Sequence, residues 1–283
     1  MPPLLAEHRR AWLSLCASAG CELIAGQVYG FGLFSDILRS KSGLNFSQAA
    51  VESVAVAENL GQYCRLAGGF VYDSCGARLT ITVGLLLNSL GYMAIYVSVR
   101  LAEAGGNDGD ASLAPVWLLC AFAATYGQGA GWIETGVVSK NVADFPANRG
   151  EAAGLLKTFF GIASAVGALA FAALLAPSRE PFLLALALCP LLFGLPLVLC
   201  VGLGSYDPLP SSDSGASQPW CGAYCVAVAV VAVLTLHSML ASLTPLLRPY
   251  EDHRPANLAA FLLALGLLAT LPALPPQRVA SGG

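Results

Sequence analysis

The amino-acid sequence predicts an all-α membrane protein, a helical bundle of about eight transmembrane helices. Composition and the arrangement of the apolar residues both lead to this prediction. Hydrophobic residues make up 56% of the 283 residues and charged residues only 11%, and the mean hydropathy is +0.68. A soluble fold of this length carries more charge. The apolar residues gather into runs long enough to cross a bilayer, and short polar loops separate these runs.

The composition also excludes several classes of function. A net charge of −3 with 14 Lys and Arg residues leaves no basic surface for nucleic acid. The nine cysteines form no C-x-x-C pair, and three histidines predict no repeated metal site. The glycines at 127, 129 and 131 lack the strand and βαβ unit of a dinucleotide loop. We therefore expect no cofactor, no enzyme and no nucleic acid partner; the expected partners are a lipid bilayer and a small-molecule solute.

The first predicted span covers residues 11 to about 38, after a short basic stretch. A cleavable signal is the alternative interpretation, because small residues follow the first apolar run. Apolar character resumes after Glu22, which favours a span that stays in the membrane. Helical spacing places Glu22, Gly26 and Tyr29 on one face. Gly26 and Gly30 form a G-x-x-x-G pattern that allows close helix packing.

The second predicted span runs from residue 47 to about 72, with Ser47 as its N-cap. One stripe along it carries an acid, an amide, a base and two glycines, namely Glu58, Gly61, Gln62, Arg65 and Gly69. A charge at the centre of a bilayer costs about 3 kcal/mol. The stripe is therefore expected to line a cavity or the interior of the bundle.

A short polar turn joins the second span to the third, which covers residues 79–99 and carries no charge. The turn occupies residues 69–78 and contains Gly69, Asp73, Gly76 and Arg78. Glycine and aspartate clusters are typical of a chain reversal between two periodic segments. We interpret the third span as scaffold.

The fourth and fifth predicted spans carry opposite charges. Residues 115 to about 139 include Gln128 and Glu134, and residues 150–176 include Lys157, with a polar loop at 140–149 between them. We expect Lys157 to be buried in a seam between helices. On an antiparallel hairpin Glu134 and Lys157 lie at similar depth, so an ion pair is expected, either as a static staple or as a moving part. Small residues on both spans favour helix packing: Gly127, Gly131, Gly150, Gly154 and Gly161.

A sixth span is predicted at residues 181–203, bent by its prolines. The Ser, Pro and Gly-rich stretch at 204–219 predicts a flexible cytoplasmic linker. Two further spans follow, at 220–243 and 257–273, and His237 in the first of them is either a packed residue or a proton relay. The predicted organisation is an N-terminal six-helix transporter bundle (1–203), the linker (204–219), and two further transmembrane helices with a short tail (220–283).

The basic residues of the short loops favour a cytoplasmic N-terminus for this multi-pass integral membrane protein. One side of the first five spans holds Arg9, Arg10, Arg78, Lys140 and Arg149, and the other side holds Arg39, Lys41 and Arg100. The turn at 69–78 is cytoplasmic in that orientation.

The string Gly69-x-x-x-Asp73-x-x-Gly76-x-Arg78 resembles the loop signature of the major facilitator superfamily. The resemblance implies a gating charge network for the acid and the base of this turn. The string Thr125-x-x-Gln128-Gly129-x-Gly131 is similar to the fourth-span signature of the same superfamily. The leading arginine of that signature, which the superfamily ties to proton coupling, is replaced here by Thr125.

A narrower resemblance is to the plant nodulin-like branch. Two strings carry it: Tyr29-Gly-Phe31-Gly32-Leu-Phe34-Ser35, and Phe145-Pro146-x-x-Arg149-Gly150-x-x-x-Gly154-x-x-Lys157-x-x-x-Gly161-x-x-Ser164. The resemblance implies a major-facilitator-like helical bundle of inverted repeats, a solute site near the bilayer midplane, and a small organic anion as solute. The residues expected at the cavity or in ion pairs are Glu22, Tyr29, Glu58, Gln62, Arg65, Gln128, Glu134 and Lys157.

Members of the superfamily have about twelve spans in two halves. This sequence predicts the first half and about two further spans, so the expected bundle is incomplete. Three interpretations follow. The chain is a truncated carrier that moves its solute by alternating access, a half-carrier that forms a homodimer or joins a second half-transporter, or a truncated or transporter-derived scaffold or partner protein without transport activity of its own.

Overall fold

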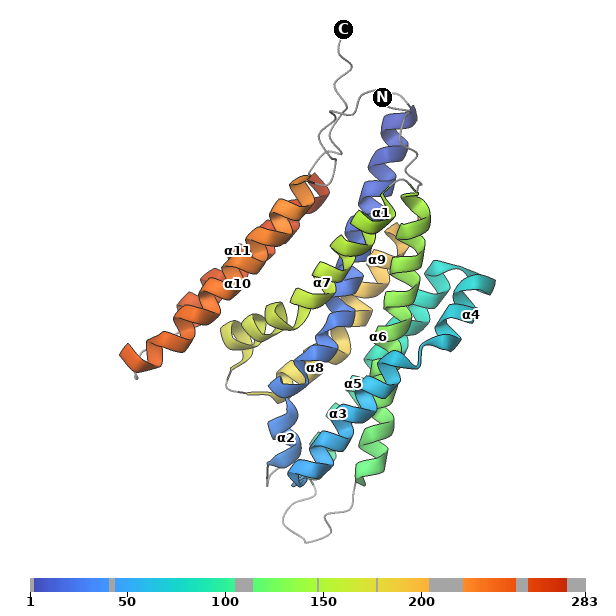
Figure 1. Ribbon diagram of the computed structural model, residues 1–283. Helices are drawn as coiled ribbons and strands as arrows, with labels where there is room; N and C mark the ends of the chain where they lie inside the picture. Colours follow the sequence, from blue (N-terminus) through green and yellow to red (C-terminus); the bar gives the residue numbers. More distant parts are fainter. Residues whose placement is uncertain are drawn as a thin grey trace.

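The structure of the chain, a computed structural model, describes residues 3–40, 44–104, 114–146, 148–176, 178–203, 221–247 and 254–273. Within these residues the regular elements are helices that run side by side in a bundle (Figure 1). Among the described residues, five helices are long and apolar enough to cross a membrane: Arg9–Arg39, Ala77–Ala104, Arg149–Leu175, Glu180–Cys200 and Arg254–Ala273. The predicted all-α membrane fold is confirmed.

The first span is not one uninterrupted α-helix. α1 (Pro3–Ala25) passes into a 3-10 helix, η1 (Gly26–Leu33), and then into the short α2 (Ser35–Arg39). A 3-10 helix has about three residues per turn where an α-helix has about 3.6, so the residues after Ala25 rotate away from the α1 face. Glu22 and Tyr29, predicted on one face, differ in exposure: Glu22 is fully buried and Tyr29 is 53% exposed.

The second span is also interrupted. α3 (Gln48–Tyr63) ends before Cys64, and α4 (Leu66–Cys75) begins after Arg65. Gln128 Nε2 donates a 2.6 Å hydrogen bond to the Cys64 carbonyl oxygen, a backbone group that would otherwise be left without a partner near the break. The prediction of a single helix over residues 47–72 is therefore wrong. The helix breaks where a side chain from a neighbouring helix bonds the Cys64 carbonyl oxygen, near the middle of the predicted span.

The polar stretch at 69–78 is mostly helical, in contrast to the turn predicted there. Residues 69–75 complete α4, and the chain reverses at Gly76, which has φ 82° and ψ 174°. Glycine adopts this backbone conformation and residues with a Cβ rarely do. α5 (Ala77–Ala104) begins directly after Gly76 and runs back along the bundle (Figure 1).

Replacing Gly76 by alanine is expected to lower the free energy of unfolding by about 1–3 kcal/mol, because a Cβ strains the backbone at this φ and ψ. Gly69→Ala is the matched control, since Gly69 is helical and a Cβ there would meet no atom within 4 Å. Equilibrium unfolding of both variants in mixed micelles measures the difference. Equal stability of the two variants would show that the reversal tolerates a side chain.

α6 (Val116–Asp144) packs between α3 and α5. Its glycines allow the backbones to approach closely. A Cβ at Gly127 would overlap the carbonyl oxygen of Glu58 in α3, and a Cβ at Gly129 would overlap the backbone nitrogen of Asn88 in α5. The helix also continues through residues 140–144, which the sequence predicts as loop. An ion pair between Lys140 and Asp144, one turn apart, accompanies this last turn.

Three glycines predicted to pack between helices do not do so. Gly150, Gly154 and Gly161 are exposed along one face of α7 (Arg149–Ala170). A Cβ at Gly150 or Gly161 would meet no atom within 4 Å. Gly30 likewise has its nearest neighbour in its own 3-10 helix, although Gly26 does pack tightly against α7. A row of small residues is compatible with a helix face packed against another helix and with an exposed face. On α7 this face is exposed.

The fifth and sixth spans contain π-helical turns. α7 ends in η2 (Phe171–Leu175). The sixth span consists of α8 (Glu180–Cys189), the π turn η3 (Pro190–Gly194) and α9 (Leu195–Cys200). Pro190 has no N–H to give to a regular α-helix, so the irregular turn coincides with the bend predicted from the prolines.

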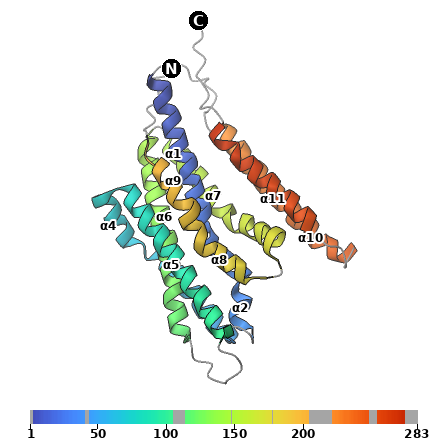
Figure 2. The ribbon, with the colours of Figure 1, turned by 180° about the vertical axis from the view of Figure 1, so that it is seen from behind.

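Two C-terminal helices pair with each other and flank α7 (Figures 1 and 2). Trp12 Nε1 of α1 donates a 3.0 Å hydrogen bond to the Leu271 carbonyl oxygen. His237 Nε2 lies 2.8 Å from Asn257 Oδ1, so His237 is a hydrogen-bonded residue between the two helices. The predicted linker at 204–219 lies outside the described residues. The helices are α10 (Cys221–Leu247) and α11 (Arg254–Ala269), followed by η4 (Leu271–Ala273).

Candidate functional site

Glu134 of α6 binds two basic side chains at once. Arg65 Nη1 pairs with Glu134 Oε2, and Lys157 Nζ pairs with Glu134 Oε1. The Glu134 side chain is 5% exposed, whereas the side chains of Arg65 and Lys157 are 36% and 49% exposed. The structure therefore contains the ion pair expected between Glu134 and Lys157. It adds Arg65 as a second base on the same carboxylate.

Glu22 of α1 completes a group that we call the four-charge cluster: Glu22, Arg65, Glu134 and Lys157. Glu22 is fully buried, and neither of its carboxylate oxygens has a hydrogen-bond partner among the described residues. It lies close enough to Lys157 and Arg65 to interact with both electrostatically. The cluster thus joins α1, α6, α7 and the break between α3 and α4. Of its two acids, Glu134 forms ion pairs with both bases.

The helix break positions Arg65, which stands immediately before α4 with φ −89° and ψ 15°. A helix N-terminus carries partial positive charge, so a base at this position is unfavourable unless an acid opposes it. Glu134 supplies that acid. Gln128 holds the break through the Cys64 carbonyl and accepts a 3.0 Å hydrogen bond from Trp132 Nε1. Gln128 therefore helps to fix the position of the backbone next to Arg65.

Lys157 lies on the exposed face of α7 that carries the glycines at 150, 154 and 161. The buried seam predicted for Lys157 is therefore wrong, since these small residues leave its side chain half exposed. Its Nζ stands 5.5 Å from the centroid of the Phe160 ring, within the range of a cation–π contact. Tyr29 packs edge to face on the same ring, with 5.3 Å between centroids.

Glu58 belongs to a separate buried group. The Tyr126 hydroxyl donates a 2.6 Å hydrogen bond to Glu58 Oε2, and the Tyr126 ring stacks on Tyr92 with 4.1 Å between centroids. Asn88 Nδ2 donates to the Tyr126 carbonyl oxygen at 3.0 Å. Gln62, one turn further along α3, is buried, and its Oε1 has no partner among the described residues. The acid and the base of the predicted stripe therefore belong to different groups.

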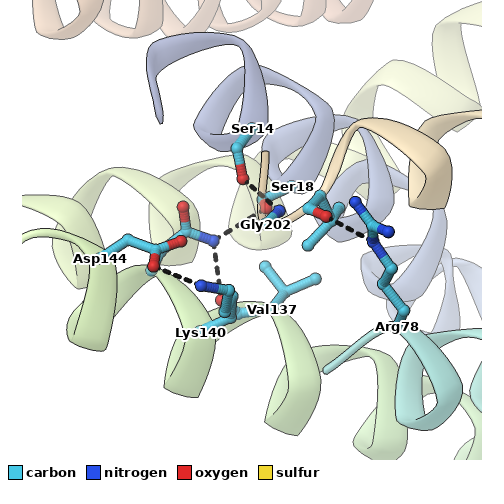
Figure 3. Close-up of polar contacts among 9 residues, drawn as sticks. Ser14, Ser18, Arg78, Val137, Lys140, Asp144 and Gly202 are labelled. Atoms are coloured by element: carbon cyan, nitrogen blue, oxygen red, sulfur yellow. Dashed lines mark hydrogen bonds and ion pairs between the residues drawn. The ribbon is translucent and has the colours of Figure 1, made fainter. Parts of the chain in front are cut away.

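A polar layer forms at the end of the bundle where α1, α6 and α9 meet (Figure 3). Arg78 Nε donates a 2.9 Å hydrogen bond to the carbonyl oxygen of Val201. The Gly202 N–H donates to Ser14 Oγ at 2.7 Å. Asn141 Nδ2 donates to Ser18 Oγ at 2.8 Å. These bonds attach the start of α5 and the middle of α1 to the end of the sixth span, and the end of α6 to α1.

The structure brings Arg78 into this layer but not Asp73. Asp73 is exposed and forms no ion pair or hydrogen bond within the described part of the chain. The acid of the layer is Asp144, which pairs with Lys140 at the end of α6 (Figure 3). Sequence reasoning missed Asp144 because it placed residues 140–149 in a loop. The gating role of Gly69, Asp73, Gly76 and Arg78 stays a prediction.

Comparison with known proteins agrees with this architecture. The nodulin-like family profile matches residues 11–270. Among curated proteins, Protein NUCLEAR FUSION DEFECTIVE 4 of Arabidopsis thaliana is 26% identical over 217 residues, which cover 76% of this chain and 35% of that protein. The chain thus spans about a third of the length of this relative. With most of its length matched, the chain belongs to the nodulin-like family, a group of major-facilitator-like, multi-pass integral membrane proteins.

Proposed function

We propose that the chain is a secondary-transporter-type membrane protein that moves a small organic anion by alternating access. The observation that carries this proposal is the four-charge cluster, in which two bases bind the buried Glu134 and stay partly exposed. Membership of the nodulin-like family supports a transporter-like role. A purely structural ion pair would have no need for two accessible bases on one acid.

The exposed bases keep donors for a solute. A guanidinium has five N–H donors and an ammonium has three, and Glu134 pairs with one terminal nitrogen of Arg65, Nη1. A carboxylate on a small solute matches the fork of the guanidinium in a bidentate arrangement. Tyr29, which is exposed and packs on the Phe160 ring beside Lys157, offers apolar contact for the carbon skeleton of the solute. These features suit an organic anion better than a neutral sugar.

Irregular helices next to the cluster supply points of movement. α1 becomes a 3-10 helix at Gly26, one turn beyond Glu22, and the break between α3 and α4 directly precedes Arg65. Secondary transporters build their solute sites near the bilayer midplane from discontinuous helices of this kind. The proposed transport cycle alternates the exposure of the cluster to the two sides of the membrane.

Uptake into proteoliposomes tests the proposal. The full chain is reconstituted, and uptake of radiolabelled mono- and dicarboxylates is compared with that of a neutral sugar. We expect uptake of an organic anion that is lost in Arg65→Gln and in Lys157→Gln. Arg100→Gln is the matched control, because Arg100 is exposed and pairs with Glu103 and Glu180 away from the cluster. Equal uptake by all three variants would refute the proposed site.

A second candidate function is that of a transporter-derived scaffold or partner protein without transport activity of its own. The chain matches 35% of the length of the curated relative, and carriers of this type bind their solute between two halves. Crosslinking in membranes to a second copy or to a second half-transporter, together with no uptake of any tested solute, would favour this function.

A further inference from the structure

Glu22 is the acid of the four-charge cluster that holds no base. Its side chain has no exposed surface, and both of its oxygens lack a hydrogen-bond partner among the described residues. An ionised carboxylate in such a place has lost its hydration and gained no replacement, so the neutral acid is the form that this geometry accommodates. Glu134 shows the contrast, since each of its oxygens is occupied by a base.

The charged neighbours of Glu22 come from the helices that contact α1. α7 contributes Lys157, and the break between α3 and α4 contributes Arg65. α6 contributes Glu134, which competes with Glu22 for the same two bases. Residues 190–200, which cover η3 and α9, contain no charged side chain. From residue 9 onward, the other titratable groups on these helices are Arg9, Arg10, Cys16 and Cys21 on α1, Cys120, Tyr126, Lys140 and Asp144 on α6, Arg149 and Glu151 on α7, and Cys200 on α9.

We propose that Glu22 is a proton-binding site, and that release of its proton draws Lys157 from Glu134 to Glu22. The proton leaves the Glu22 carboxyl group for water, and Lys157 keeps its own charge throughout. Arg65 stays on Glu134, so neither acid is left ionised without a base. The exchange replaces an ion pair between α6 and α7 by one between α1 and α7. Proton binding would therefore decide which pair of helices is held together.

Counting charges links the proton to the solute, and this step rests on the proposed function. With Glu22 protonated, the two positive bases and the negative Glu134 leave the cluster with a net charge of +1. One organic anion with a single charge then makes the loaded cluster neutral. With Glu22 deprotonated, the empty cluster is neutral as well. Because moving a net charge through the membrane field is costly, one proton is expected to travel with each anion.

Infrared difference spectroscopy on the purified full chain tests the proton site without requiring transport. Spectra are compared between acidic and alkaline buffer. We expect the carbonyl band of a protonated carboxyl group to disappear in alkaline buffer, and this change to be lost in Glu22→Gln. Glu52→Gln is the control, because Glu52 is an exposed acid on α3. Glu22→Asp keeps a carboxyl group and is expected to shift the band, so the test does not depend on the glutamine variant alone. An unchanged band in both Glu22 variants would overturn the proposal.

Uptake with and without an inward proton gradient tests the coupling. We expect the gradient to accelerate anion uptake by the wild-type chain and to have no effect on Glu22→Gln. If the gradient accelerates both proteins equally, Glu22 is not the coupling site, although the proposed transport function stands. If neither protein moves an anion but the infrared band depends on Glu22, the transport function fails and the proton site stands. The two failures are therefore distinguishable.

Discussion

Replacing Glu134 by glutamine is expected to lower the free energy of unfolding by about 2–3 kcal/mol and to abolish anion uptake. Arg65 and Lys157 both lose the carboxylate that they share. Removal of one partner from a buried charge pair costs about 2–5 kcal/mol. The lower part of that range applies because solvent reaches both bases. Equilibrium unfolding in mixed micelles and uptake into proteoliposomes measure the two effects.

The controls for this prediction separate the shared arrangement from a simple ion pair. Glu52→Gln is expected to leave stability unchanged, since Glu52 is exposed and bonds only to Gln48 among the described residues. Lys157→Gln is expected to cost less than Glu134→Gln, because Arg65 still pairs with the acid. The charge swap Glu134→Lys with Lys157→Glu is expected to restore stability only in part, because Arg65 then faces a lysine. Full restoration by the swap would contradict the shared arrangement.

Gly127→Val is expected to be the most damaging substitution in the scaffold, with a loss of about 3 kcal/mol or more. A Cβ at Gly127 would overlap the carbonyl oxygen of Glu58 in α3. The obstacle is backbone, so no side chain can rotate aside and α3 and α6 must move apart. Such a movement would also carry Arg65 away from Glu134. The yield of monodisperse protein after purification, followed by equilibrium unfolding, measures the effect.

Gly161→Val is the matched control for Gly127→Val. Gly161 lies on a transmembrane helix of the same bundle, but a Cβ there would meet no atom within 4 Å. The same change of residue is therefore expected to stay within about 1 kcal/mol of the wild type. If the two valine variants lose stability equally, the cost comes from helix propensity and not from the contact between α3 and α6.

Much of the architecture could be predicted from hydrophobic runs. A chain in lipid must satisfy its backbone within each segment, so an apolar run of sufficient length predicts a helix. The ion pair between Glu134 and Lys157 could also be predicted from the sequence. A short connection makes two helices antiparallel, and counting residues from the connection gives the depth of each side chain. The exposure of Lys157 could not be predicted, because a row of glycines on α7 is compatible with a face packed against another helix and with an exposed face.

Other parts of the site depend on contacts between segments far apart in the chain. Arg65 and Glu134 are separated by 69 positions, and no local pattern joins them. The break before Arg65 follows from the Gln128 side chain reaching the Cys64 carbonyl, not from a proline or glycine at the break. Tyr126, which bonds Glu58, is an aromatic residue within a largely apolar span, so its hydroxyl group gives no periodic signal.

By itself the sequence determined the all-α membrane class, the approximate extent of the spans, the family resemblance and the acids and bases that the membrane would have to accommodate. Only the tertiary structure decided how those charges are shared. It placed Arg65 and Lys157 on Glu134, left Glu22 buried without a base, and left Tyr29 half exposed. The physical reason is that helical periodicity states which residues share a face. Which neighbour that face meets is set by close backbone packing and by the 3-10 and broken segments that rotate one part of a span against the next.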